Sequence, residues 1–318
     1  KSINRARTLK TVIQQGPRGV ENEAAERRVL ARRGWAGKKS GRFQHPLNGE
    51  YGMNKPKPAP LRERDITRQI AREYYKEFDQ LIESDVIIVG AGPSGLICAH
   101  DLADMGFRTV IVEQSLALGG GFWHGGYLMN KATICAPAHK ILEEIGVPCK
   151  KIKDCDGMYM VDPPHATGAL VAAAYHGGAK VLNLTRVVDL ILRRDGVLEG
   201  VVVNNTTAEM AGHDLIHVDP IGLESKIVVD ATGHDAVVVN LLHKRNLYTA
   251  VPGNGAMWVS RSEEDVMNHT GEVYPNCFVI GLAVAAVHGT PRMGPAFGSM
   301  LLSGRYGAEL IKKKLKNE

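Results

Sequence analysis

The stretch Asp85-Val-Ile-Ile-Val89, followed immediately by Gly90-Ala-Gly92-Pro-Ser-Gly95, decides the fold class. Its apolar, β-branched run predicts a short buried strand, and the glycines predict a turn into a helix. In such a unit Gly90 permits the tight turn, Gly92 lets the backbone approach a pyrophosphate, and Gly95 lets the helix pack closely on the sheet. The start of the helix, where Ser94 lies, offers unpaired N–H groups to phosphates.

A second strand and an acidic residue complete this unit. Leu96 to Met105 has helical periodicity, and Arg108 to Val112 is again apolar and β-branched. Glu113 ends this second strand, where a carboxylate can accept hydrogen bonds from the hydroxyls of an adenosine ribose. An acid here favours an unphosphorylated ribose, so the unit predicts a Rossmann-like α/β fold that binds NAD or FAD rather than NADP. Gln114 could also reach the adenosine.

Composition is that of an ordinary globular protein. The 318 residues are 44% hydrophobic and 23% charged, enough for one large or two modest domains. The longest apolar runs fall far below the roughly 18 residues of a membrane-spanning helix, so we expect a cytoplasmic protein without a membrane partner. The five cysteines form no CxxC pair, which argues against a disulfide framework and a structural zinc site.

Basic charge is concentrated in residues 1–52. This prefix holds 12 of the 39 Lys and Arg but only four of the 34 Asp and Glu, so the remainder is slightly acidic and gives no reason to expect a nucleic-acid partner. The prefix lacks the apolar residues needed to order itself. A flexible arm, a basic nucleic-acid tail and upstream sequence translated in frame are three open interpretations. We favour the third, because Gly49-Glu50 can be encoded by a ribosome-binding sequence spaced correctly before the Met53 codon.

Residues 53–84 are expected to form an N-terminal amphipathic helix, and residues 85–318 a single domain. Ile66, Ile70 and Phe78 recur at helical spacing between Asp65 and Ser84, so this helix should pack through its apolar side. Glycines at 119–121 and 125–126 predict a second loop that could lie against a ligand. Further strands are expected at Ala179–Leu182, Gly200–Val203, Lys226–Asp230 and Cys277–Ile280, before a terminal helix from about Ser299.

The order of these elements resembles the flavoprotein family related to glutathione reductase, with an additional β-rich region. In flavin-binding members the late strand usually ends in Gly-Asp, whereas this chain has Gly281-Leu282.

Residues 85 to 316 more specifically resemble the thiamine thiazole synthase family. Each shared motif is short, but their order and spacing are specific: Gly90–Gly95, Glu113, Gly119–Gly121, His217-Val-Asp-Pro220, Ala231–Asp235, Val287-His288, Arg292-Met-Gly294 and Phe297-Gly298. The resemblance implies an enzyme of thiamine biosynthesis that consumes NAD as a substrate. With glycine, sulfur and Fe(II) it forms an adenylated thiazole carboxylate and releases nicotinamide.

The resemblance also assigns roles to single residues. It implies that Asp219 and His234 bind Fe(II), for which a carboxylate and an imidazole are reasonable ligands, and that Arg292 binds the glycine carboxylate. It places dinucleotide contacts at Gly90, Gly92, Ser94, Gly95, Glu113, Gln114, Gly121, Val187 and Leu282, the last two chiefly through their backbone. Relatives usually carry Arg beside the ribose-binding Glu, where this chain has Gln114.

The residue at position 217, a histidine, differs from that of the eukaryotic family members in an informative way. In eukaryotic members a cysteine stands two residues before the metal-binding Asp and gives up its sulfur, and an imidazole has none to give. The chain therefore resembles the archaeal and anaerobic bacterial branch, which takes sulfur from free sulfide. His217 is the expected catalytic residue, although it could hydrogen-bond an intermediate, act as an acid or base, or only fill space. The family also implies a homo-octamer with sites shared between subunits.

Other functions stay open at this stage. A flavin-dependent oxidoreductase of the same fold is one alternative, and a ribose-1,5-bisphosphate isomerase is another. The non-enzyme alternative is a dinucleotide sensor or a nucleic-acid-binding protein that uses residues 1–52.

Overall fold

The computed structural model describes residues 57–317, apart from 127, 194–195, 213 and 216. The chain divides into two units, residues 1–66 and 67–318, and the second contains the sheets and the candidate site. The basic prefix 1–52 and the expected start at Met53 lie outside the described residues.

The predicted α/β fold is confirmed by a sheet whose core strands are parallel. Its parallel strands, in spatial order, are β11 (Cys277–Val279), β9 (Ile221–Asp230), β1 (Glu83–Val89), β2 (Thr109–Val112) and β6 (Lys180–Leu182). Nearly every residue of β1 and β2 is buried, as expected of parallel strands covered on both faces. The register pairs Val89 with both Val112 and Asp230, so three strands end side by side.

The additional β-rich region consists of antiparallel strands at the edges. A hairpin of β7 (Thr185–Leu192) and β8 (Leu198–Asn205) extends the sheet from the first half of β9, and β10 (Gly271–Tyr274) pairs with β11. A separate small sheet contains β3 (Ala132–Cys135), β5 (Met158–Val161) and β4 (Lys150–Lys151).

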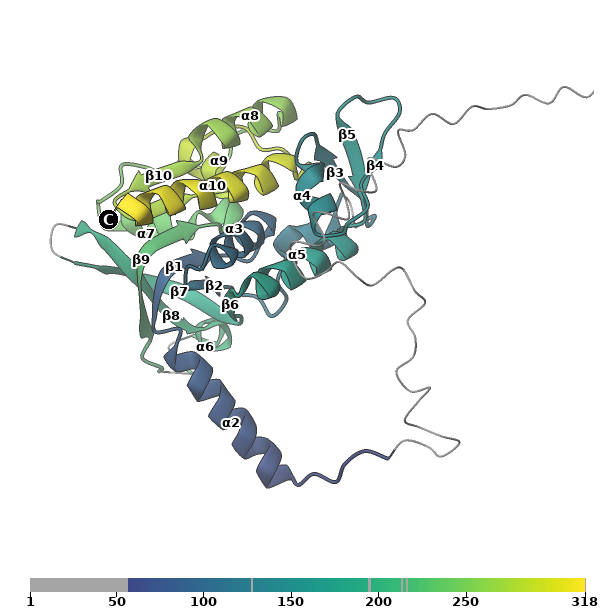
Figure 1. Ribbon diagram of the computed structural model, residues 1–318. Coiled ribbons are helices and arrows are strands. Elements are labelled where there is room, and N and C mark those ends of the chain that lie inside the picture. Colours follow the sequence, from purple (N-terminus) through teal and green to yellow (C-terminus); the bar gives the residue numbers. More distant parts are fainter. Residues whose placement is uncertain (1–56, 127, 194–195, 213, 216, 318) are drawn as a thin grey trace, which may run out of the picture. The chain divides into compact units, whose positions relative to one another are not determined.

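Eight α-helices follow α2 among the described residues. They are α3 (Pro93–Asp104), α4 (His139–Glu144), α5 (Pro163–Gly177), α6 (Thr206–Ala211), α7 (Val237–Lys244), α8 (Val259–His269), α9 (Leu282–His288) and α10 (Gly298–Asn317). Figure 1 shows α3 between α5 and α10, packed on β1 and β2. Nine of the twelve residues of α3 are buried, so this helix is a fixed part of the core.

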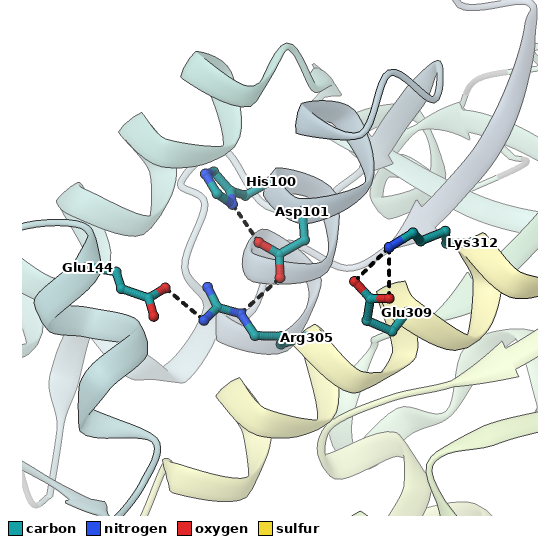
Figure 2. A network of polar contacts seen from close by, with 6 residues as sticks. All are labelled: His100, Asp101, Glu144, Arg305, Glu309 and Lys312. Atoms are coloured by element: carbon teal, nitrogen blue, oxygen red, sulfur yellow. Dashed lines mark hydrogen bonds and ion pairs between the residues drawn. The ribbon is translucent and has the colours of Figure 1, made fainter. Parts of the chain in front are cut away.

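An ion-pair network fastens α3 to its neighbours. Figure 2 shows Arg305 of α10 between Asp101 of α3 and Glu144 of α4. Its guanidinium donates to Asp101 at 3.0 Å and to Glu144 at 2.7 Å, and His100 contacts the other oxygen of Asp101 at 2.7 Å. Because these contacts join three helices, they hold α3, and therefore its N-terminus, in one position.

The amphipathic helix differs from its prediction in two ways. The helix α2 (Glu63–Asp79) ends before Ser84, because residues from Glu83 onward pair with β9 as strand β1. The helix also buries none of its residues, and Ile70 and Tyr74 are 65% and 56% exposed. The expected packing of its apolar side is therefore absent among the described residues of a single chain. Within the described residues, the helices are too short or too polar to span a bilayer.

Candidate active site

A cavity of about 440 Å³ lies at the carboxyl ends of β1, β2 and β9. Residues that directly follow each strand line it, including Gly90 after β1, Glu113 after β2 and Ala231 after β9. Ligands of open α/β sheets bind at this edge, so the cavity is where the glycine motif predicts a dinucleotide.

The glycine turn has the geometry that its sequence predicts. Gly90 has a φ of +102°, and a Cβ there would lie 2.5 Å from the carbonyl oxygen of Ala231. A Cβ on Gly95 would lie 2.1 Å from the carbonyl oxygen of Gly90, so Gly95 serves close packing and does not line the cavity. Gly92 lines the cavity, and no atom lies within 4 Å of its Cβ position. The turn therefore leaves open space beside the N-terminus of α3, where phosphates can bind.

Glu113, which follows β2, hydrogen-bonds to the glycine turn that follows β1. The residue is only 8% exposed. One carboxylate oxygen accepts from the backbone N–H of Ala91 at 2.8 Å, and the other accepts from the N–H of Ser115 at 2.7 Å. A carboxylate oxygen has room for more than one hydrogen bond, so Glu113 can brace both turns and still accept from a ribose.

The structure brings most of the predicted dinucleotide residues to one cavity. Beyond Gly90, Gly92 and Glu113, it is lined by Ser94, Gln114, Gly121, Val187 and Leu282. Ser94 is buried and Gln114 is exposed, while Leu282 begins α9. These residues come from four separate parts of the sequence, and their convergence supports the predicted site.

His234 lines the same cavity from a short 3-10 helix, η4 (Gly233–Asp235). Its Nδ1 lies 3.0 Å from the Nδ2 of Asn254, while the Oδ1 of Asn254 is buried without a hydrogen-bond partner among the described residues. A half-turn of this amide exchanges the two atoms. Oδ1 then accepts from Nδ1–H of His234, and Nε2 keeps its lone pair. Asn254 can thus fix the tautomer in which His234 is able to bind a metal.

Asp230 anchors the turn that carries His234. This carboxylate is fully buried at the end of β9 and accepts from the N–H and hydroxyl of Thr232 and from the N–H groups of Val238 and Val239. Burial raises the pKa of Asp230, and these hydrogen bonds oppose the rise. The four bonds cap α7 and fix the turn at Ala231 to Asp235.

Besides Gly95, three predicted residues lie outside the cavity. Asp219 and His217 are exposed in the segment before β9, and neither lines the cavity. Arg292 is exposed and does not line it either, although Gly294, two residues later, does. Among the described residues, no three His, Cys, Asp or Glu side chains lie close enough to hold a metal ion. One chain therefore does not bring Asp219 into the cavity that His234 lines.

All five cysteines lie in the described residues, and none of them lines the cavity. Burial raises the pKa of Cys135 to about 12 and that of Cys149 to about 11, and it also raises the pKa of Cys98 and Cys277. Cys155 is exposed. Because the thiolate is the reactive form, the four thiols with raised pKa values are poorly suited to sulfur chemistry.

Sequence reasoning missed Asp230, Asn254 and Arg186. Asp230 could have been noticed as a carboxylate that ends an apolar strand directly before Ala231-Thr-Gly233. Asn254 and Arg186 carry no local signal, because tertiary folding alone brings them to His234 and to the cavity wall.

Comparison with known proteins identifies the family of this chain. The sequence profile described as the Thi4 family matches residues 67–297. The chain belongs to the Thi4 family. Similar proteins named thiamine thiazole synthase include one from Aeropyrum pernix, 49% identical over 81% of this chain and 94% of its own length, and one from Pyrococcus horikoshii, 42% identical over 81% and 100%.

A solved structure of the Thi4 family is also similar. The crystal structure of Thermovibrio ammonificans THI4 superposes with a TM-score of 0.77 at 38% identity, covering 81% of this chain and all of that chain. The resemblance to thiamine thiazole synthases seen in the sequence is therefore confirmed at the level of the family and the fold.

Proposed function

We propose that this protein is a thiamine thiazole synthase that forms an adenylated thiazole carboxylate from NAD, glycine and free sulfide with Fe(II), releasing nicotinamide. One observation carries the proposal: a single cavity holds both the ribose-type carboxylate Glu113 and the imidazole of His234. A nucleotide bound at one end of this cavity would present its far ribose to the other end.

The nucleotide end follows from the fold. The open space at Gly92 and the N-terminus of α3 would take the pyrophosphate, and Glu113 would accept from the adenosine ribose. Ser94, Gln114, Gly121, Val187 and Leu282 would surround the same molecule. These groups orient NAD and hold its adenosine half, while its nicotinamide is lost.

Fe(II) fits the donor chemistry of His234 and Asp219. An imidazole with a held tautomer and a carboxylate are ligands that iron accepts, and Asn254 provides the hydrogen bond that aligns the imidazole. Bound iron would supply Lewis acidity and orient the substrates. Arg292, which makes no ion pair with another described residue, would pair with the glycine carboxylate near Gly294.

A second copy of the chain would supply Asp219 and His217. Both are exposed, and the apolar residues around them are exposed as well: Leu215 by 76%, Val218 by 47% and Ile221 by 47%. Apolar surface of this kind favours burial against another subunit. We therefore place the Asp219 segment of one subunit at the His234 cavity of its neighbour in a homo-oligomer, the octamer that the family implies. In that position His217 would reach the reacting centre.

The sulfur is proposed to come from free sulfide. His217 has no sulfur to give, and no cysteine lines the cavity. A chain that keeps all its thiols can turn over repeatedly.

Product analysis tests this function. The full chain would be incubated anaerobically with NAD, glycine, sulfide and Fe(II), and the products followed by mass spectrometry, with glycine omitted as a control. We expect more than one adenylated thiazole per chain and an unchanged protein mass. A single turnover with loss of one sulfur atom from the protein would overturn the sulfide-using reaction. A flavin absorption band and no thiazole product would favour a flavin-dependent oxidoreductase instead.

A further inference from the structure

Arg186 is the one arginine among the residues that line the cavity. It is the second residue of β7, and its neighbour Val187 is buried while Arg186 itself is exposed. Because side chains alternate along a strand, the two point to opposite faces of β7. No hydrogen bond or ion pair joins the guanidinium of Arg186 to another described residue. The guanidinium is therefore available to a ligand.

The start of β7 is fastened to the segment after β2. The N–H of Thr185 donates to the carbonyl of Glu113 at 2.9 Å, and the N–H of Leu184 donates to the carbonyl of Ser115 at 3.1 Å. The hydroxyl of Thr206 donates to the carbonyl of Gln114 at 2.8 Å. Arg186 thus belongs to one rigid wall that begins at Glu113.

The order of the groups in a dinucleotide determines which part of the ligand would lie against this wall. The phosphates belong at Gly92 and the N-terminus of α3, and the adenosine ribose belongs at Glu113. The adenine is attached to the ribose on the side away from the phosphates. It must therefore lie beyond Glu113, where Gln114, Ser115 and residues 185–187 line the cavity.

We propose that Arg186 binds the adenine, with its guanidinium plane against one face of the base. The inference rests on the proposed function, since it takes the adenosine to lie at Glu113. A guanidinium is planar and weakly hydrated, so it stacks on aromatic faces in a way that an ammonium does not. The β7–β8 ladder shifts register between Val187 and Asp189, and such a bulge leaves backbone groups outside the ladder. These groups can meet the edge of the base while Arg186 covers its face.

Binding of ADP-ribose to the full chain tests this assignment by calorimetry. Arg186→Ala removes the guanidinium, and Arg186→Lys keeps the charge but not the plane. Arg193→Ala is the matched control, because Arg193 is exposed just past the end of β7, pairs with Glu199 and Glu224, and does not line the cavity. We expect Arg186→Ala and Arg186→Lys each to weaken binding about three- to ten-fold, with no change in the control.

A second readout follows the base itself. An etheno-adenine analogue of ADP-ribose is fluorescent, and acrylamide should quench it more strongly when it is bound to Arg186→Ala than to the wild type. Equal affinity and equal quenching in the two proteins would refute the assignment. Full rescue by Arg186→Lys would also refute it, since a charge on a phosphate would then explain the effect. Failure of the wild type to bind ADP-ribose would refute the proposed function before any variant is measured.

Discussion

The carboxylate of Glu113 stabilises the turns around the cavity and is also the proposed acceptor for the ribose. Both of its oxygens already accept backbone N–H groups, from Ala91 and Ser115. A ribose hydroxyl would add to these bonds and would not replace them. The carboxylate is thus positioned before any ligand arrives, which lowers the cost of ordering the site on binding.

Replacing Glu113 should therefore affect both binding and stability. We expect Glu113→Ala to weaken ADP-ribose binding by about 1 to 3 kcal/mol, the usual cost of losing hydrogen bonds to a charged group. Calorimetry measures the affinity, and thermal unfolding without ligand reports the loss of the bonds from Ala91 and Ser115. Glu113→Gln keeps one oxygen acceptor, so its affinity for ADP-ribose should lie between those of the wild type and Glu113→Ala. Unchanged affinity in Glu113→Ala would place the ribose elsewhere.

Asn254 should control metal affinity through His234. Removing the amide in Asn254→Ala frees the ring to rotate and to change tautomer, so Fe(II) binding should weaken about 10- to 100-fold. Anaerobic titration against a competing chelator measures this without relying on turnover. Asn254→Asp retains an acceptor for Nδ1–H and is the control expected to keep most of the affinity. Wild-type affinity in Asn254→Ala would show that the contact with His234 has no such role.

The residues of the glycine turn could be placed together from the local sequence, whereas the spatial positions of the proposed metal ligands Asp219 and His234 could not. Gly90, Gly95 and Glu113 act within one strand-turn-helix-strand unit, whose geometry is fixed by local backbone requirements. Asp219 and His234 stand 15 positions apart, but β9 extends between them, and a strand carries its two ends far from each other. Asp219 and His234 are therefore near each other in the sequence but not in the folded chain.

Among the elements, the glycine turn that leads into α3 uses one glycine for packing and another for the proposed binding of a ligand. Gly95 touches the backbone of Gly90, whereas Gly92 faces open space and has an extended conformation that any residue can adopt. Two substitutions of the same size at neighbouring positions should therefore have different consequences.

The pair Gly95→Ala and Gly92→Ala tests this separation. A methyl group on Gly95 would lie 2.1 Å from a carbonyl oxygen, so α3 must shift, and we expect a clearly lower midpoint of thermal unfolding. Gly92→Ala should unfold like the wild type but bind ADP-ribose more weakly, because its methyl group occupies the space for the pyrophosphate. Circular dichroism melts and calorimetry distinguish the two effects. Similar melting of both variants would contradict this account of the turn.

Element types were more predictable than element ends. The predicted strands all exist, but β8 and β9 are longer than their apolar cores because hairpin pairing continues into half-exposed residues. The glycine loop after β2 contains a 3-10 helix, η2 (Gly120–His124), which repetition of glycine alone does not reveal. The helix α5 begins with Pro163 and Pro164, since proline is well accommodated in the first turn of a helix.

At the scale of the whole molecule, the described chain holds half of the proposed reaction centre. His234 lines the cavity, and Asp219 stands exposed among exposed apolar residues. Such a division is what an assembly with shared sites would leave on each subunit, because a residue donated to a neighbour must lie on the surface of its own chain.

Mixing two inactive variants tests whether the site is shared. Asp219→Ala and His234→Ala should each lose most bound Fe(II) and all thiazole formation, because each removes one proposed ligand. If the ligands come from different subunits, some sites in a mixed assembly combine an intact His234 with an intact Asp219. For equal amounts assorting at random, about a quarter of the sites would be complete, so about a quarter of the wild-type activity and iron should return. The two chains would be expressed together so that they assemble jointly, with each variant alone as the control. If one chain supplies both ligands, every site in the mixture lacks one of them. The shared site would then be refuted by a mixed assembly that recovers neither bound iron nor activity.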